Sequence, residues 1–154
     1  MFFIKSCCFI GHKNCTREIS ERLLFEIEEL ITKKDVNCFY VGTQGNFDKL
    51  SYEVLSSLEK KYEIKINVVL AYLNKKTDNP YYDADKTIFP DELTKTPMRY
   101  AIRKRNSYMI GKADYIVSYL NTPFSNAYCN IEEAVRKKKY IINIGAFNVE
   151  SIAL

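Results

Sequence analysis

Short apolar runs alternate with helix-spaced segments along the whole chain, and this alternation constrains the fold more than any other feature. Strands that alternate with helices form a parallel sheet with helices on both faces, linked by right-handed crossovers. We therefore predict one α/β domain over residues 1–154, with about five mostly parallel strands. The expected strands are residues 2–10, 38–41, 64–73, 115–120 and 140–144, and the expected helices are residues 16–32, 46–60, 97–111 and 127–138.

Composition places the chain among globular proteins and argues against several kinds of site. Apolar residues make up 47% and charged residues 27% of the sequence, as in a typical soluble domain. The apolar start is short and is interrupted by Lys5, so we expect neither a signal peptide nor a membrane span, and a cytoplasmic location. We expect the five cysteines to be reduced. Because His12 is the only histidine, we expect no metal site, and no cofactor is expected.

A glycine-spaced turn between the second strand and the second helix is the first candidate ligand contact. Gly42 and Gly45 allow close backbone approach, and the helix that follows can present free N–H groups to an anion. Asn46 is the expected N-cap, and Asp48 suits the first helical turn. An ordinary strand-to-helix turn would explain the same residues equally well.

Four polar loops follow the expected strands, and in a parallel sheet the carboxyl ends of the strands form the ligand crevice. Each candidate also has a purely structural interpretation, such as a cap, a turn contact or a surface salt bridge. Glu132 and Glu133, on the last helix, are candidate catalytic carboxylates only if the protein is an enzyme. The candidate ligand-binding residues are Gly11, His12, Lys13, Gly42, Thr43, Gln44, Gly45, Asn46, Asp48, Arg105, Asn106, Thr122, Phe124, Ser125 and Asn126.

The segment of residues 74–96 is expected to be a long loop with a functional role, because loops of this length are unusual in compact domains. Tyr81, Tyr82 and Phe89 can stack on a base or simply pack the loop. Acidic residues in this segment have no spacing typical of a calcium or magnesium loop.

Charge gives little reason to expect nucleic-acid binding. The formal net charge is +4, and the basic run of residues 136–139 is interpreted as the solvated end of a helix, where cations favour the dipole. We see no basic stripe with interleaved aromatic residues, so a nucleic-acid partner is not expected.

Four motifs in order resemble the SLOG superfamily, the Rossmann-like group that includes the DprA/Smf proteins and the LOG phosphoribohydrolases. They cover most of the chain and look like a stand-alone bacterial and phage branch with a "CCFxGHR" start, which suggests a link to phage or defence-related signalling. The motifs are CCFIGHK at residues 7–13, GTQGNFD at 42–48, RNSYM with ADYIV at 105–117, and KKKYIINI at 137–144.

The resemblance implies a Rossmann-like doubly wound sheet that binds a nucleotide or a nucleotide-derived signal, ADP-ribose-like or cyclic, for sensing or sequestration. It also implies a homo-oligomer, and helix 97–111 has more apolar residues than one buried face needs. A LOG-like nucleoside-monophosphate N-glycosidase, with Arg105 and Glu132 as catalytic residues, is the alternative. Where the LOG enzymes have a glycine-rich loop, this chain has FSNA at residues 124–127. Because the glycines of that loop are missing here, binding is favoured over catalysis. DprA-like DNA binding is a weaker alternative.

Overall fold

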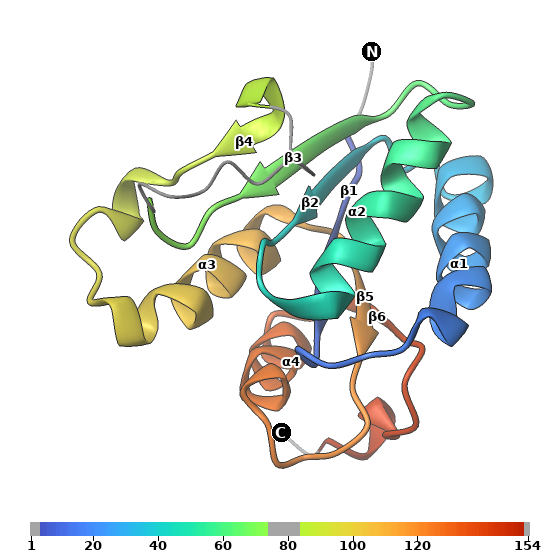
Figure 1. The fold of residues 1–154 in the computed structure, drawn as a ribbon. Helices are drawn as coiled ribbons and strands as arrows, with labels where there is room; N and C mark the ends of the chain where they lie inside the picture. The colour runs from blue at the N-terminus through green and yellow to red at the C-terminus, as the bar shows by residue number, and fades with distance from the viewer. Residues whose placement is uncertain (1–3, 74–83, 153–154) are drawn as a thin grey trace.

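A computed structural model describes residues 4–73 and 84–152 (Figure 1). Its centre is a six-stranded sheet in the order β4-β3-β2-β1-β5-β6, in which every pair of neighbours is parallel. The strands are β1 (Ser6–Gly11), β2 (Cys38–Val41), β3 (Lys65–Val69), β4 (Thr87–Ile88), β5 (Tyr115–Tyr119) and β6 (Tyr140–Asn143).

Helices cover both faces of the sheet, which confirms the Rossmann-like α/β fold. Helices α1 (Ser20–Lys33) and α2 (Gly45–Glu59) pack on one face, and α3 (Met98–Lys112) and α4 (Asn126–Arg136) pack on the other (Figure 1). Short 3-10 turns lie at Arg17–Ile19, Ala84–Lys86, Asp91–Leu93 and Val149–Ser151. None of the described helices is long and apolar enough to cross a membrane.

The sheet separates two hydrophobic cores, and successive side chains along a strand point alternately into one core or the other. Phe9, on β1, faces the core under α1 and α2, whereas its neighbours Cys8 and Ile10 face the core under α3 and α4. Complete burial of such a side chain contributes about 1.5–3 kcal/mol. Cys7, Cys8 and Cys38 are all buried in strands, and desolvation raises the pKa of both the Cys7 and Cys8 thiols.

The segment expected to be one long loop contains an additional edge strand. Thr87–Ile88 pairs in parallel with Val68 and Val69 of β3. Its β-branched residues fit a strand, but two residues are too few to show alternation in the sequence. Tyr81, Tyr82 and Asp83 of the expected loop lie outside the described residues.

The first strand covers Ser6–Gly11, so within the described residues it begins after Lys5 and extends one residue beyond the expected end at Ile10. Gly11 still pairs with Tyr119 of β5. His12 is therefore the first residue after the strand, and its backbone N–H donates to the carbonyl of Tyr119.

Candidate functional site

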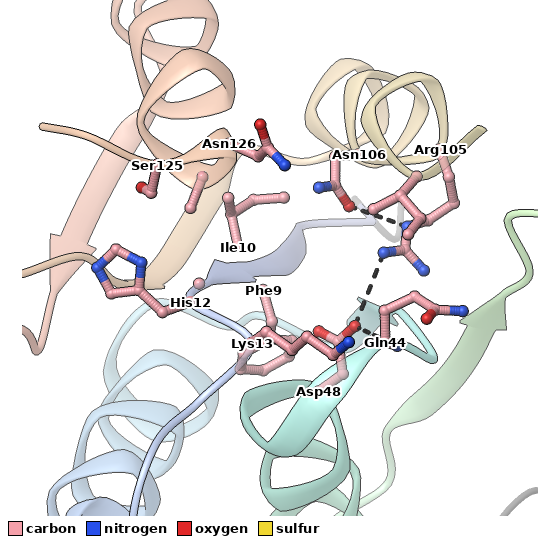
Figure 2. Close-up of a pocket in the computed structure, with 13 residues that line it drawn as sticks. Phe9, Ile10, His12, Lys13, Gln44, Asp48, Arg105, Asn106, Ser125 and Asn126 are labelled. Carbon is pink, nitrogen blue, oxygen red and sulfur yellow. Dashed lines mark hydrogen bonds and ion pairs between the residues drawn. The ribbon is translucent and has the colours of Figure 1, made fainter. Parts of the chain in front are cut away.

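A cavity of about 300 Å³ opens at the carboxyl ends of the central strands. The chain order of the strands reverses beside β1, because β2, β3 and β4 lie on one side of it and β5 and β6 on the other. Crevices at such reversals are the usual ligand sites of open parallel sheets. The lining residues are Phe9, Ile10, Gly11, His12, Lys13, Gln44, Asp48, Ile102, Arg105, Asn106, Ser125, Asn126 and Ala127 (Figure 2).

Arg105 of α3 reaches across the strand ends to α2, which lies on the opposite face of the sheet. Its side chain is only 2% exposed, and Nη2 lies 3.7 Å from Oδ2 of Asp48. Nη1 donates to the carbonyl of Val69 at 3.2 Å, and Nε donates to Oδ1 of Asn106 at 2.9 Å. The guanidinium therefore connects β3, α3 and α2 and forms part of the cavity wall.

The pairing of Arg105 differs from the structural alternative considered for it, which was a salt bridge on the helix surface. Both members of the pair are buried. The Asp48 carboxylate also accepts the backbone N–H of Gln44 at 2.9 Å. Desolvation raises the pKa of Asp48, while the Arg105 guanidinium and the Gln44 N–H oppose that shift. Asp48 is thus more than a first-turn charge on an exposed helix end.

The N-terminus of α2 begins earlier than predicted, and Asn46 is not its N-cap. Gln44 occupies the N-cap position, and the helix starts at Gly45, whose φ of +85° is in the region that favours glycine. The backbone N–H of Asn46 donates to the carbonyl of Lys13 at 2.7 Å. That hydrogen bond ties the loop after β1 to the start of α2.

The side-chain amides of Asn106 and Asn130 form a hydrogen-bonded chain that holds the Arg105 side chain in place. Nδ2 of Asn106 donates to Oδ1 of Asn130 at 3.2 Å, and Nδ2 of Asn130 donates to the carbonyl of Arg103 at 3.4 Å. Because Asn106 gives its Nδ2 to Asn130, its Oδ1 faces Nε of Arg105. This network joins α3 to α4, and the Asn130 side chain in it is buried.

The opposite end of the cavity is formed by the loop after β1 and the N-terminus of α4 (Figure 2). Nε2 of His12 accepts the backbone N–H of Asn121 at 2.7 Å, so in the neutral ring Nδ1 carries the proton. Desolvation lowers the pKa of His12, which favours that neutral ring. Oγ of Ser125 accepts the backbone N–H of Tyr128 at 3.2 Å as the N-cap of α4.

The structure brings together nine of the sequence-derived candidates and leaves six away from the cavity wall. Phe9, Ile10, Ile102 and Ala127 also line the cavity, although they had not been candidates; they are apolar, and nothing in the sequence separates them from core residues. Those that line the cavity are Gly11, His12, Lys13, Gln44, Asp48, Arg105, Asn106, Ser125 and Asn126, whereas Gly42, Thr43, Gly45, Asn46, Thr122 and Phe124 do not.

Several of the candidates away from the wall have structural roles of their own. Gly42 lies beneath the Arg105 guanidinium, and Asn46 borders a smaller, separate pocket beside Arg17 and Lys49. Oγ1 of Thr122 accepts the backbone N–H of Phe124, whose own side chain is 91% exposed.

The two glutamates that were candidate catalytic groups do not line the cavity. Oε1 of Glu133 accepts the hydroxyl of Ser107 at 2.8 Å, in the contact between α3 and α4. Among the described residues, Asp48 is therefore the carboxylate that the cavity offers to a ligand.

The sequence matches no protein-family model and no curated protein sequence. Solved structures that share the fold include the following two. One is DNA processing protein A (DprA) from Streptococcus pneumoniae, with a TM-score of 0.66 and 11% identity, covering 91% of this chain and 50% of that chain. The other is TM1055, with a TM-score of 0.55 and 16% identity, covering 90% of this chain and 72% of that chain. The chain thus spans half the length of the DprA chain.

At these identities the likeness shows the fold alone. The chain shares its fold with part of the DprA chain.

Proposed function

We propose that the cavity binds a nucleotide or a nucleotide-derived signal, ADP-ribose-like or cyclic, in order to sense or sequester it. The observation that carries this proposal is Arg105, a buried cation held on the wall of a cavity at the carboxyl ends of the strands. The planar guanidinium is suited to phosphate oxygens, and a site shielded from water strengthens the attraction.

The charges and donors of the cavity fit an anionic ligand with hydroxyl groups. Lys13 and Arg105 supply two cations against the single carboxylate of Asp48. Ser125 and Asn126 mark the N-terminus of α4, where the helix dipole favours negative charge. The Asp48 carboxylate is an acceptor, and sugar hydroxyls are donors that suit it.

Binding is better supported than the N-glycosidase alternative. Cleavage of a nucleotide needs a carboxylate beside the sugar to stabilise the transition state or activate water. Glu132 and Glu133 do not line the cavity, and the carboxylate that does, Asp48, is already paired with Arg105 and with the backbone N–H of Gln44. DNA binding has only the fold likeness to DprA in its favour.

A thermal-shift screen with recovery of the ligand tests the proposal. The purified protein is heated with nucleoside monophosphates, NAD, ADP-ribose and its cyclic isomers, and each compound is then analysed by chromatography. A ligand at a hundred times its Kd stabilises the fold by about 2.7 kcal/mol, which raises Tm by about 5–10 °C. We expect at least one compound to give such a shift and to return intact.

Lys13→Ala and Lys5→Ala form a matched pair of variants for the screen. Both lysines are exposed and flank β1, but Lys13 follows the carboxyl end of the strand and lines the cavity, whereas Lys5 precedes the other end. We expect Lys13→Ala to reduce the shift and Lys5→Ala to preserve it. Arg105→Lys keeps the charge without the planar fork and should also reduce the shift.

Three results would count against binding as proposed. If no compound in the panel shifts Tm, the nucleotide class is wrong. An equal shift in the Lys13→Ala and Lys5→Ala variants would place the ligand outside this cavity. Recovery of a free base with a sugar phosphate would make the protein an enzyme, and the Asp48→Asn variant would then test its remaining carboxylate.

A further inference from the structure

Helices α1 and α3 present outward surfaces of opposite charge, each centred on an exposed aromatic side chain. We infer that copies of this chain associate head to tail, with the α3 surface of one copy against the α1 surface of the next. This inference does not depend on the ligand of the cavity. The inference specifies which two surfaces would form the homo-oligomer that was expected from the sequence.

The α3 surface is basic and has no acid of its own. The helix Met98–Lys112 contains no aspartate or glutamate. Its Tyr100 is 52% exposed, and the guanidinium of Arg99 lies over the Tyr100 ring, 4.8 Å from its centroid. Arg103 and Lys104 follow Tyr100 by three and four residues, which places them beside it on the same side of the helix. Both are exposed, and within the described parts of the chain neither forms a salt bridge with a carboxylate.

The α1 surface has the complementary arrangement. Phe25 is 59% exposed, which is unusual for so large an apolar side chain on a helix that already buries Leu23, Ile27 and Leu30. Glu21 and Glu29 lie four residues before and after it, one helical turn to either side. The helix has four glutamates, Glu21, Glu26, Glu28 and Glu29, against Arg22 and Lys33. Glu29 pairs with Lys33 and Glu28 pairs with Lys61, each at 3.1 Å, so the acidic excess of this surface comes from Glu21 and Glu26.

Charge decides the geometry of the association. If two copies paired α3 against α3, the cations of one helix would face those of the other, and like charges at an interface are unfavourable. The contact of α3 with α1 instead places Arg103 and Lys104 opposite glutamates and buries Tyr100 with Phe25. Aromatic side chains and arginine are the residue types most enriched in the energetically dominant parts of interfaces.

The positions of the two helices in the fold determine what such a contact builds. Helices α1 and α3 lie on opposite faces of the sheet (Figure 1). Each copy that uses its α3 surface therefore still has an unused α1 surface, so the association continues into a ring or a filament rather than stopping at a dimer. A contact centred on one helix from each copy buries less than about 1,200 Å², so we expect it to be weak and dependent on concentration.

Charge reversal tests the interface directly. One variant is Glu21→Lys with Glu29→Lys on α1, and the other is Arg103→Glu with Lys104→Glu on α3. Sedimentation velocity at low salt should give a weight-average mass for the natural chain that rises with concentration above the 18.0 kDa of one chain. Each variant alone should remain at that mass, because its contact now joins like charges.

An equimolar mixture of the two variants separates charge pairing from a general effect of mutation. The basic α1 of the first variant meets the acidic α3 of the second, and the unaltered α3 and α1 surfaces also fit each other, so the mixture should associate again. Salt near 1 M, where the screening length falls to about 3 Å, should reduce that association. Circular dichroism melting checks that both variants are folded.

Three outcomes would overturn the inference: a natural chain that stays at 18.0 kDa across the concentration range, a mixture that remains at the mass of one chain, or association that both reversals leave unchanged. A chain that remains a monomer but binds a short single-stranded oligonucleotide through Arg103 and Lys104 would instead assign the α3 surface to nucleic acid.

Discussion

A Cβ atom on Gly42 would lie 2.3 Å from Nη1 of Arg105 and 2.6 Å from Oδ2 of Asp48. Gly42 follows β2, at the point where the Arg105 side chain passes from α3 towards α2. The absence of a side chain at this position therefore leaves room for the buried ion pair. Gly42 and Arg105 are 63 residues apart in the sequence, and their dependence on each other appears only in the fold.

At this scale, we predict that two glycine-to-alanine substitutions differ in their effect on stability. Gly42→Ala forces the Arg105 guanidinium away from its contacts and should lower the free energy of unfolding by about 1–3 kcal/mol. Gly111→Ala is the control, because a Cβ there has no heavy atom within 4 Å and the residue lies in α3. Since alanine favours helix by up to about 1 kcal/mol over glycine, Gly111→Ala should be neutral or stabilising.

Urea denaturation of both variants measures the difference. Equal stability of Gly42→Ala and the natural chain would mean that the ion pair tolerates displacement. Our explanation of the glycine would then be wrong.

Which side chains face the cavity could be predicted only in part from the sequence. Arg105, Asp48 and Gln44 are polar residues at the ends of expected elements, and that position was enough to make them candidates. Thr43 and Asn46 had the same signal but do not line the cavity. Because the helix starts at Gly45, Asn46 lies within its first turn and borders the smaller pocket instead. A shift of one or two residues at a helix start changes which side chains face a crevice, and sequence patterns do not resolve such shifts.

Among the elements, α3 and α4 are coupled by polar contacts at their shared surface. Asn130 of α4 bonds both to the Asn106 side chain and to the backbone of Arg103, and Ser107 bonds to Glu133. Asn106 in turn holds Nε of Arg105. The orientation of α4 therefore affects the position of the buried guanidinium. Asn130 acts on Arg105 indirectly, through the side chain of Asn106.

We predict that Asn130→Ala lowers the free energy of unfolding by about 1–3 kcal/mol, because it leaves the Nδ2 group of Asn106 and the carbonyl of Arg103 without that partner. Asn148→Ala is a control, since Asn148 caps only the 3-10 turn at Val149–Ser151 through the backbone N–H of Glu150. If the two substitutions cost the same in chemical denaturation, the amide chain has no special part in the contact of α3 with α4.

The number and order of the elements could largely be predicted from the sequence, because hydrophobic periodicity reports burial directly. In the described part of the chain, all four α-helices and five of the six strands were predicted near their observed positions. Strand β4 was not, since a pair of residues has no period, and its strand character depends on β3 beside it. The end of β1 at Gly11 likewise depends on its partner Tyr119, more than a hundred residues away in the chain.

For the molecule as a whole, the sheet predicts a gradient of local stability. Strand β1 is paired on both sides, and Cys7, Cys8, Phe9 and Ile10 are buried. Strand β4 is two half-buried residues at the edge. We expect hydrogen exchange of the backbone amides to be slowest in β1 and fastest, among the strands, at Thr87 and Ile88. Equal protection of β1 and β4 would show that the sheet opens as one unit.

The parallel pairing of β1 also has a consequence for the order in which the protein can be completed during synthesis. One edge of β1 pairs with residues 38–40, which the ribosome adds soon after it, but the other edge pairs with residues 115–119. The nascent chain must therefore keep half of its central strand unpaired while most of the molecule is still being translated. Chaperones that shield open strand edges would act on this protein in that interval.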